Sequence, residues 1–62
     1  MKKWKVGSGR APDWIKERLM LYLRADGAVG YEIQGRGLTL HAKKGDVVTM
    51  KDNGDIKVEA VD

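Results

Sequence analysis

The sequence contains no cysteine and only one histidine among its 62 residues. A disulfide framework is therefore excluded, and so are the usual structural zinc sites, whose ligands are cysteine and histidine. A chain without cysteine fits the reducing cytoplasm, which is the localisation we expect. From this composition we expect neither a metal ion nor a cofactor.

The sequence also lacks a long hydrophobic run. No segment approaches the ~20 apolar residues of a membrane-spanning helix, and the basic start Met1–Lys3 is not followed by the apolar core of a signal peptide. We therefore expect no association with a membrane. Residues 1–62 are long enough for one small domain only. A domain of about 60 residues is marginally stable alone, so a homodimer or higher homo-oligomer is a natural expectation.

Residues suited to catalysis are scarce. His41 is expected on the polar face of a strand, opposite Gly30, and Ser8 could act as a nucleophile only if the fold brought it to this histidine. Asp52 flanks a turn but lacks the spaced acidic loop of a calcium site, and the segment 35–37 is too short to cradle a phosphate. We predict a non-enzymatic protein with no catalytic residue.

What the sequence does contain is a clear β-hairpin within residues 42–60. Asn53-Gly54 between two β-prone runs is a strong turn signal. A two-residue loop there would mix polar and apolar side chains on each face. A three-residue loop over 52–54 sorts the two faces and gives Gly54 the left-handed position that such a loop needs. The pairs it predicts are Met50 with Ile56, Val48 with Val58, Lys51 with Asp55 and Thr49 with Lys57.

A strand and a helix are predicted before this hairpin. Residues 2–6 alternate between lysines and apolar residues, which is typical of a strand at the edge of a sheet. Pro12 suits the first turn of a helix, and Asp26-Gly27 suits its end. Between them, apolar residues recur at helical spacing, which predicts a helix over residues 12–25. These residues are Ile15, Leu19, Tyr22 and Leu23.

A second hairpin is predicted in the middle of the chain. Residues 29–34 and 38–42 both alternate, and a two-residue loop at Gly35-Arg36 would pair apolar with apolar side chains. The pairs are Ile33 with Leu38, Tyr31 with Leu40 and Val29 with Ala42. The predicted fold class is α+β: an N-terminal strand, one helix, and a four-stranded antiparallel meander packed on the helix or curled as a small barrel.

Two segments carry a resemblance to known proteins. The run Ala42-x-Lys44-Gly45-Asp46, followed by Asn53-Gly54-Asp55, is similar to the A-x-K-G-D and N-G-[DE] hairpin of a family of small bacteriophage and prophage proteins. Residues 12–15 resemble the P-x-W-I segment of the same family. Val47 departs from the pattern, since the family carries Trp or Tyr there. The resemblance implies a phage origin and the host-cell cytoplasm, but no chemistry, because the family has no general assigned function.

Positive charge is concentrated in the first three quarters of the chain. Residues 1–45 hold ten basic and four acidic residues, whereas residues 46–62 hold two and five. A basic face with aromatic side chains is the usual means of binding single-stranded nucleic acid. The candidate nucleic-acid-binding residues are Lys2, Lys3, Trp4, Lys5, Arg10, Arg36, Lys43 and Lys44.

Protein binding is the function that we favour from the sequence. Trp14, Met20 and Leu21 flank the apolar stripe of the predicted helix and could form a contact patch or a dimer seam. The prediction is a small phage-type accessory protein that acts by binding a host protein as an inhibitor or adaptor. The alternative is a nucleic-acid-binding module that uses the basic face.

Overall fold

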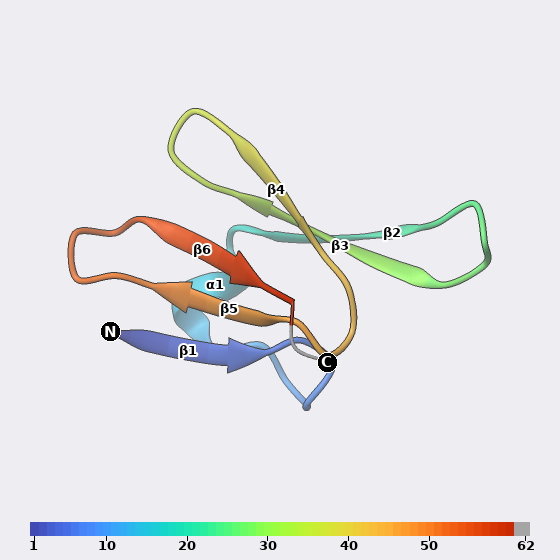
Figure 1. Cartoon of the computed structure of the whole chain (residues 1–62), viewed down its shortest axis with the longest axis horizontal. Coiled ribbons are helices and arrows are strands. Elements are labelled where there is room, and N and C mark those ends of the chain that lie inside the picture. Colours follow the sequence, from blue (N-terminus) through green and yellow to red (C-terminus); the bar gives the residue numbers. More distant parts are fainter. Residues whose placement is uncertain (61–62) are drawn as a thin grey trace.

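The computed structural model describes residues 1–60, which form mostly β-strands (Figure 1). These 60 residues form six strands in two antiparallel sheets of three, in the orders β1-β5-β6 and β2-β3-β4, and the sheets do not close into a barrel. The elements are β1 (Lys2–Lys5), α1 (Asp13–Lys16), β2 (Leu19–Leu23), β3 (Val29–Gln34), β4 (Thr39–Ala42), β5 (Val47–Met50) and β6 (Ile56–Glu59). The predicted α+β class is therefore wrong, and so is the predicted four-stranded meander, because β3 and β4 belong to one sheet and β5 and β6 to the other. Within residues 1–60, no helix is long and apolar enough to cross a membrane.

The predicted helix over residues 12–25 is replaced by one helical turn, α1, and by strand β2. The apolar run Leu19–Leu23 fits a strand as well as a helix, so periodicity alone does not decide between them. Pairing with β3 decides the conformation, because it places Leu19 opposite Ile33 and Leu21 opposite Tyr31. Tertiary pairing thus overrides the local helical spacing.

The β2–β3 and β5–β6 hairpins have loops of the same construction. Each loop has three residues and ends in a glycine with positive φ, +86° at Gly27 and +90° at Gly54. In each loop the middle side chain accepts the N–H two residues further on at 3.0 Å: Asp26 from Ala28, and Asn53 from Asp55. The predicted three-residue loop of β5–β6 is confirmed, as are its pairs Met50–Ile56, Val48–Val58 and Thr49–Lys57.

The loop of the β3–β4 hairpin lies one residue further along the chain than predicted. Gly35 donates its N–H to the carbonyl of Leu38 at 2.9 Å, which leaves Arg36 and Gly37 as the two residues of the loop. Ile33 therefore lies opposite Leu40, and Tyr31 lies opposite Ala42. The three predicted pairs Ile33–Leu38, Tyr31–Leu40 and Val29–Ala42 are wrong. The shift in pairing is two residues, so each side chain stays on the predicted face. Gly37, with φ of +70°, supplies the left-handed conformation in this loop.

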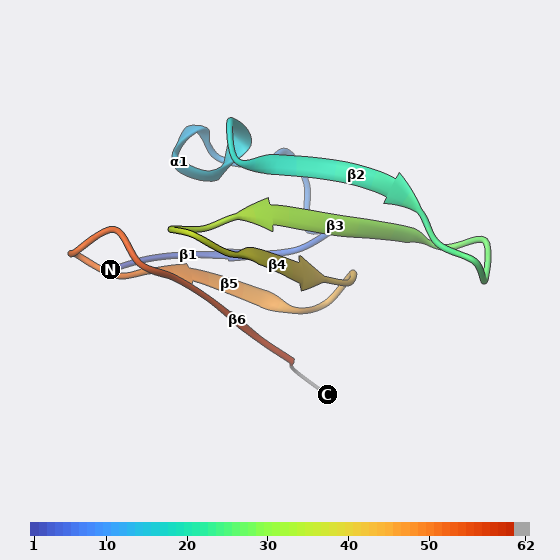
Figure 2. The same cartoon turned by 90° about the horizontal axis from the view of Figure 1, so that it is seen from above.

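The core lies between the two sheets, which are stacked as layers (Figure 2). Its buried side chains come from both sheets, from α1 and from the residue after β1: Val6, Ile15, Ile33, Ala42 and Val48. Val6 is fixed by two backbone hydrogen bonds to the turn before β5, donating to Asp46 at 2.8 Å and accepting from Gly45 at 2.9 Å. β1 is an edge strand, as predicted, and its lysines are exposed.

Candidate functional site

The outer half of the β2–β3 hairpin projects beyond the other strands (Figures 1 and 2). It carries exposed apolar side chains. Leu21 is 61% exposed, Leu23 is 77% exposed and Val29 is 46% exposed. Leu23 lies opposite Val29 across the hairpin, and Leu21 is two residues from Leu23 on the same strand. All three therefore lie on one face of the sheet. We call Leu21, Leu23 and Val29 the hairpin patch.

The hairpin patch is the continuation of the core face of its sheet. Leu19 and Ile33 lie on the same face, opposite each other, and both belong to the core or pack against it. Towards the tip, the hairpin passes beyond the strands of the other sheet (Figure 2). There the apolar side chains on this face are exposed. An apolar face that starts in the core and continues without cover is typical of a contact surface.

The opposite face of the hairpin is occupied by Tyr22 and its neighbours. The Tyr22 ring lies over Gly30 and meets the ring of His41 edge-on, with centroids 6.1 Å apart. His41 lies opposite Glu32, not opposite Gly30 as predicted, and its Nε2 is 3.9 Å from a carboxylate oxygen of Glu32. Its side chain is 63% exposed, as expected for a surface histidine.

The two polar candidates, Ser8 and His41, each contact another group in the structure. The hydroxyl of Ser8 donates to the carbonyl of Lys5 at 2.6 Å, which commits its proton to a neighbouring backbone atom. Among residues 1–60, no group of three His, Cys, Asp or Glu side chains is placed to hold a metal ion.

The structure separates the three predicted protein-contact residues. Met20 and Leu21 are exposed on β2, but they are adjacent in a strand and so lie on opposite faces. Trp14 is half-buried and packs against the core. Leu23 and Val29 were missed by the sequence analysis. If residues 19–23 are assigned to a strand paired with residues 29–33, Leu23 lies on the same face as Leu21 and opposite Val29.

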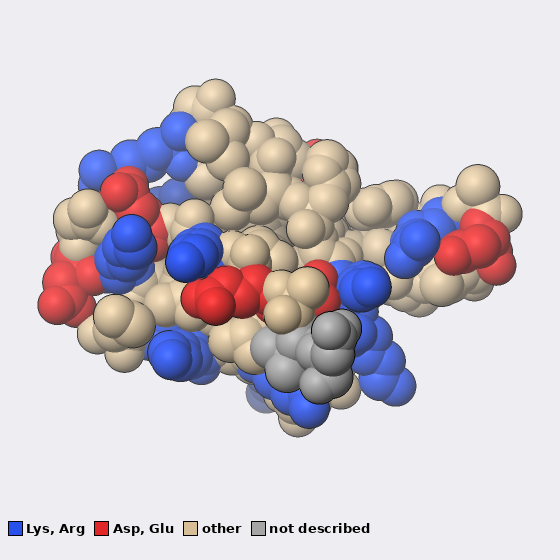
Figure 3. Space-filling view, in the orientation of Figure 1, with Lys and Arg blue, Asp and Glu red and all other residues tan. Residues whose placement is uncertain are grey.

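The predicted nucleic-acid-binding residues lie in several parts of the molecule. Lys2, Lys3, Trp4 and Lys5 belong to β1, and the Trp4 ring is half-buried and meets Tyr31 edge-on at 6.5 Å. Arg10 is exposed in the loop after β1. Lys43 and Lys44 lie in the turn between β4 and β5, where they line a groove together with Arg24 and Tyr31. Figure 3 shows acidic side chains interspersed among the basic ones on one face of the molecule.

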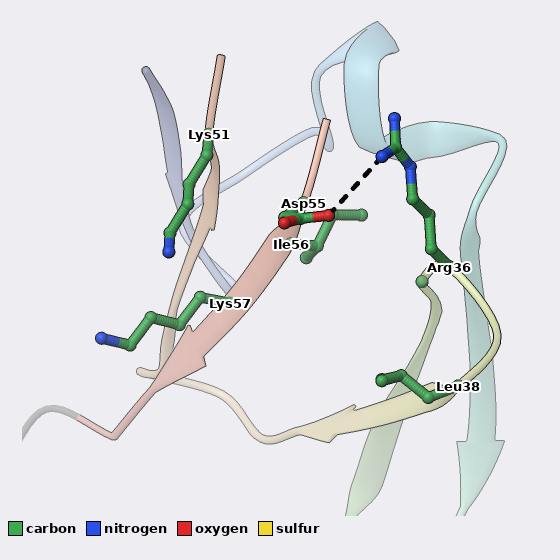
Figure 4. Close-up of a pocket in the computed structure, with 7 residues that line it drawn as sticks. Arg36, Leu38, Lys51, Asp55, Ile56 and Lys57 are labelled. Atoms are coloured by element: carbon green, nitrogen blue, oxygen red, sulfur yellow. Dashed lines mark ion pairs between the residues drawn. The ribbon is translucent and has the colours of Figure 1, made fainter. Parts of the chain in front are cut away.

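Arg36 lies in a different pocket, between the β3–β4 and β5–β6 turns (Figure 4). Its guanidinium is 3.9 Å from the carboxylate of Asp55. Lys51 and Lys57 lie on the other side of this carboxylate. Arg36 therefore faces an acidic partner within the chain, and it lines a different hollow from Lys43 and Lys44.

Comparison of the chain with protein-family models, with curated proteins and with solved structures gives no significant match. The resemblance to small phage proteins therefore stays a prediction.

Proposed function

We propose that the protein is a non-enzymatic, phage-type accessory protein that binds a host protein through the hairpin patch. The observation that supports this is the exposure of Leu21, Leu23 and Val29 on a projecting hairpin, with Leu23 at 77%. Burying an exposed leucine side chain contributes about 1.5–3 kcal/mol. A partner that covers the patch would therefore gain several kilocalories per mole from a few side chains.

The surroundings of the patch indicate the chemistry of the partner. Val29 also borders the groove that is lined by Arg24, Lys43 and Lys44. Interfaces commonly have an apolar centre with a polar rim. A matching partner surface would present apolar side chains for the patch and carboxylates beside them for the basic groove.

The test is capture of host protein from a nuclease-treated bacterial lysate by the tagged chain. Leu23→Ser removes the most exposed side chain of the patch and should abolish capture. Leu38→Ser is the matched control, because Leu38 is 54% exposed but lies in the β3–β4 loop. Circular dichroism checks that both variants fold. Equal capture by the two variants would contradict the proposal.

A second candidate function is single-stranded nucleic-acid binding in the basic groove. Arg24, Lys43 and Lys44 line it beside Tyr31, and none of the lining residues within 1–60 is acidic. The test is a fluorescence titration with labelled single-stranded oligonucleotides at several salt concentrations. If this function holds, Lys43→Glu with Lys44→Glu should lower the affinity and reduce its salt dependence. Leu23→Ser should leave nucleic-acid affinity unchanged.

A further inference from the structure

The outer edge of β2 is unpaired. In the sheet order β2-β3-β4, β2 pairs with β3 on one side, and no strand within residues 1–60 pairs with its other side. Natural edge strands commonly carry lysine, proline or a bulge that discourages pairing with another chain. The edge strand β1 has three lysines among its four residues, but β2 is Leu-Met-Leu-Tyr-Leu and has no such protection.

The backbone groups that face this open edge belong to the three leucines of β2. Arg24 donates to the carbonyl of Ala28 at 2.8 Å, and Gln34 donates to the carbonyl of Arg18 at 2.9 Å. In an antiparallel pair, residues alternate between bonding their neighbour and pointing away from it. Residues 18, 20, 22 and 24 therefore bond β3, while Leu19, Leu21 and Leu23 direct their N–H and C=O groups outwards.

We propose that a second copy of the chain pairs with this edge, antiparallel and with the two-fold axis at Leu21. The sequence of β2 is self-complementary in this register: Leu21 lies opposite Leu21, Leu19 opposite Leu23, and Met20 opposite Tyr22 of the other copy. Each leucine would donate and accept one bond, which gives about six hydrogen bonds between the chains. A shift of the axis to Leu19 or Leu23 would leave fewer residues of β2 paired.

The proposed pairing would join the two β2-β3-β4 sheets into one continuous six-stranded sheet. A two-fold axis perpendicular to the sheet keeps the same face of each copy on the same side. The two hairpin patches would therefore lie next to each other on one face. The dimer does not depend on the proposed function, because it uses the backbone edge and leaves the patch free to contact a host protein.

One contact in this register is unfavourable, and it provides a test. Arg18 would lie opposite Arg24 of the other copy at each end of the paired strands. Both side chains are exposed, and Arg24 is already paired with Asp26 at 3.2 Å. Cross-strand charge pairs of the same sign are destabilising and those of opposite sign are stabilising. Arg18→Glu would replace two repulsive contacts by two attractive ones.

The experiment is sedimentation equilibrium of the full chain at a series of protein and salt concentrations. The wild-type chain should form a dimer, and Arg18→Glu should lower its dissociation constant about tenfold. Added salt should tighten the wild-type dimer and weaken the Arg18→Glu dimer, because screening reduces both repulsion and attraction. Arg10→Glu is the control for net charge, since Arg10 is exposed in the loop after β1. It should not reproduce the tightening.

A second variant tests the backbone edge itself. Leu21→Pro removes an N–H that faces outwards and spares the hydrogen bonds to β3, and proline is tolerated on edge strands. It should be monomeric with an unchanged β-sheet circular dichroism spectrum. A wild-type chain that stays monomeric at millimolar concentration, or a dimer whose constant Arg18→Glu leaves unchanged, would overturn the proposal. The effect of Leu23→Ser on capture of a host protein tests the proposed function separately. Failure of the dimer proposal can therefore be distinguished from failure of the proposed function.

Discussion

The ring of Tyr22 lies on Gly30, its partner across the β2–β3 hairpin. A Cβ atom at Gly30 would overlap the Tyr22 ring, so the absence of a side chain allows the ring to lie on the strand. Gly30 is buried although it is in the projecting hairpin. This contact covers β3 on the face opposite the hairpin patch. The hairpin patch lies on the other face, away from this contact, and its side chains stay exposed.

Gly30→Ala should lower the free energy of unfolding by about 1 kcal/mol, because the added methyl group displaces the Tyr22 ring. The displaced ring would also lose its edge-on contact with His41. Urea denaturation followed by circular dichroism measures the change. In the Tyr22→Ala background the same substitution should be neutral or stabilising, because Gly30 has no positive φ and alanine suits a strand better. An equal loss in both backgrounds would show that the ring contact is not the cause.

The β5–β6 hairpin could be predicted because all its signals are local. Alternation excludes the two-residue loop at Asn53-Gly54, and the position of Gly54 then selects the three-residue loop, because such a loop ends in a residue with positive φ. The β3–β4 register could not be fixed in the same way. A shift of two residues keeps every side chain on its face, so the hydrophobic pattern is the same for both loops. Gly35 and Gly37 are both suited to a turn, so the sequence does not show which of the two loop positions is used.

Strand β2 could not be predicted because its two strongest signals are ambiguous. Five consecutive apolar residues fit a strand or a buried helix. Gly27 has the left-handed conformation that also ends many helices, yet here it closes a hairpin loop. Only the pairing with β3 distinguishes the two structures. The hairpin patch was missed for the same reason, since Leu23 and Val29 meet only when Leu19–Leu23 is a strand.

Thr49→Val should raise the free energy of unfolding by about 1 kcal/mol. Thr49 is 5% exposed, and its hydroxyl oxygen has no hydrogen-bond partner among the described residues. A buried hydroxyl without a partner carries a desolvation cost that an isosteric methyl group removes. Thermal denaturation measures the change. Thr39→Val is the matched control, because Thr39 is exposed on β4 and should change stability by less than about 0.5 kcal/mol. Destabilisation by Thr49→Val would indicate a partner for this hydroxyl.

Asp46→Ala should lower the free energy of unfolding by about 1–3 kcal/mol. The carboxylate of Asp46 is buried, with the residue 7% exposed, and accepts the N–H of Lys43 at 3.0 Å. Without it, this N–H loses its charged acceptor in the turn that leads into β5. Asp46→Asn should lose less, because the amide oxygen can still accept the bond. Urea denaturation of the two variants tests the order, and an equal loss would point to packing instead of the hydrogen bond.

The contact between Asp52 and the N-terminus should make stability depend on pH at the acidic end. The N-terminal ammonium of Met1 donates to Asp52 at 2.8 Å, and this hydrogen bond, with the positive charge that makes it, lowers the pKa of Asp52 below its ordinary value of 3.8. Because the pKa is lower in the folded chain than in the unfolded chain, the contact stabilises the fold above pH 3.8 and loses this effect as the pH falls through the folded pKa. An NMR titration of the Asp52 carboxyl carbon measures this pKa directly. Acetylation of the N-terminus should return it to the ordinary value, and a titration curve that acetylation leaves unchanged would assign the shift to another group.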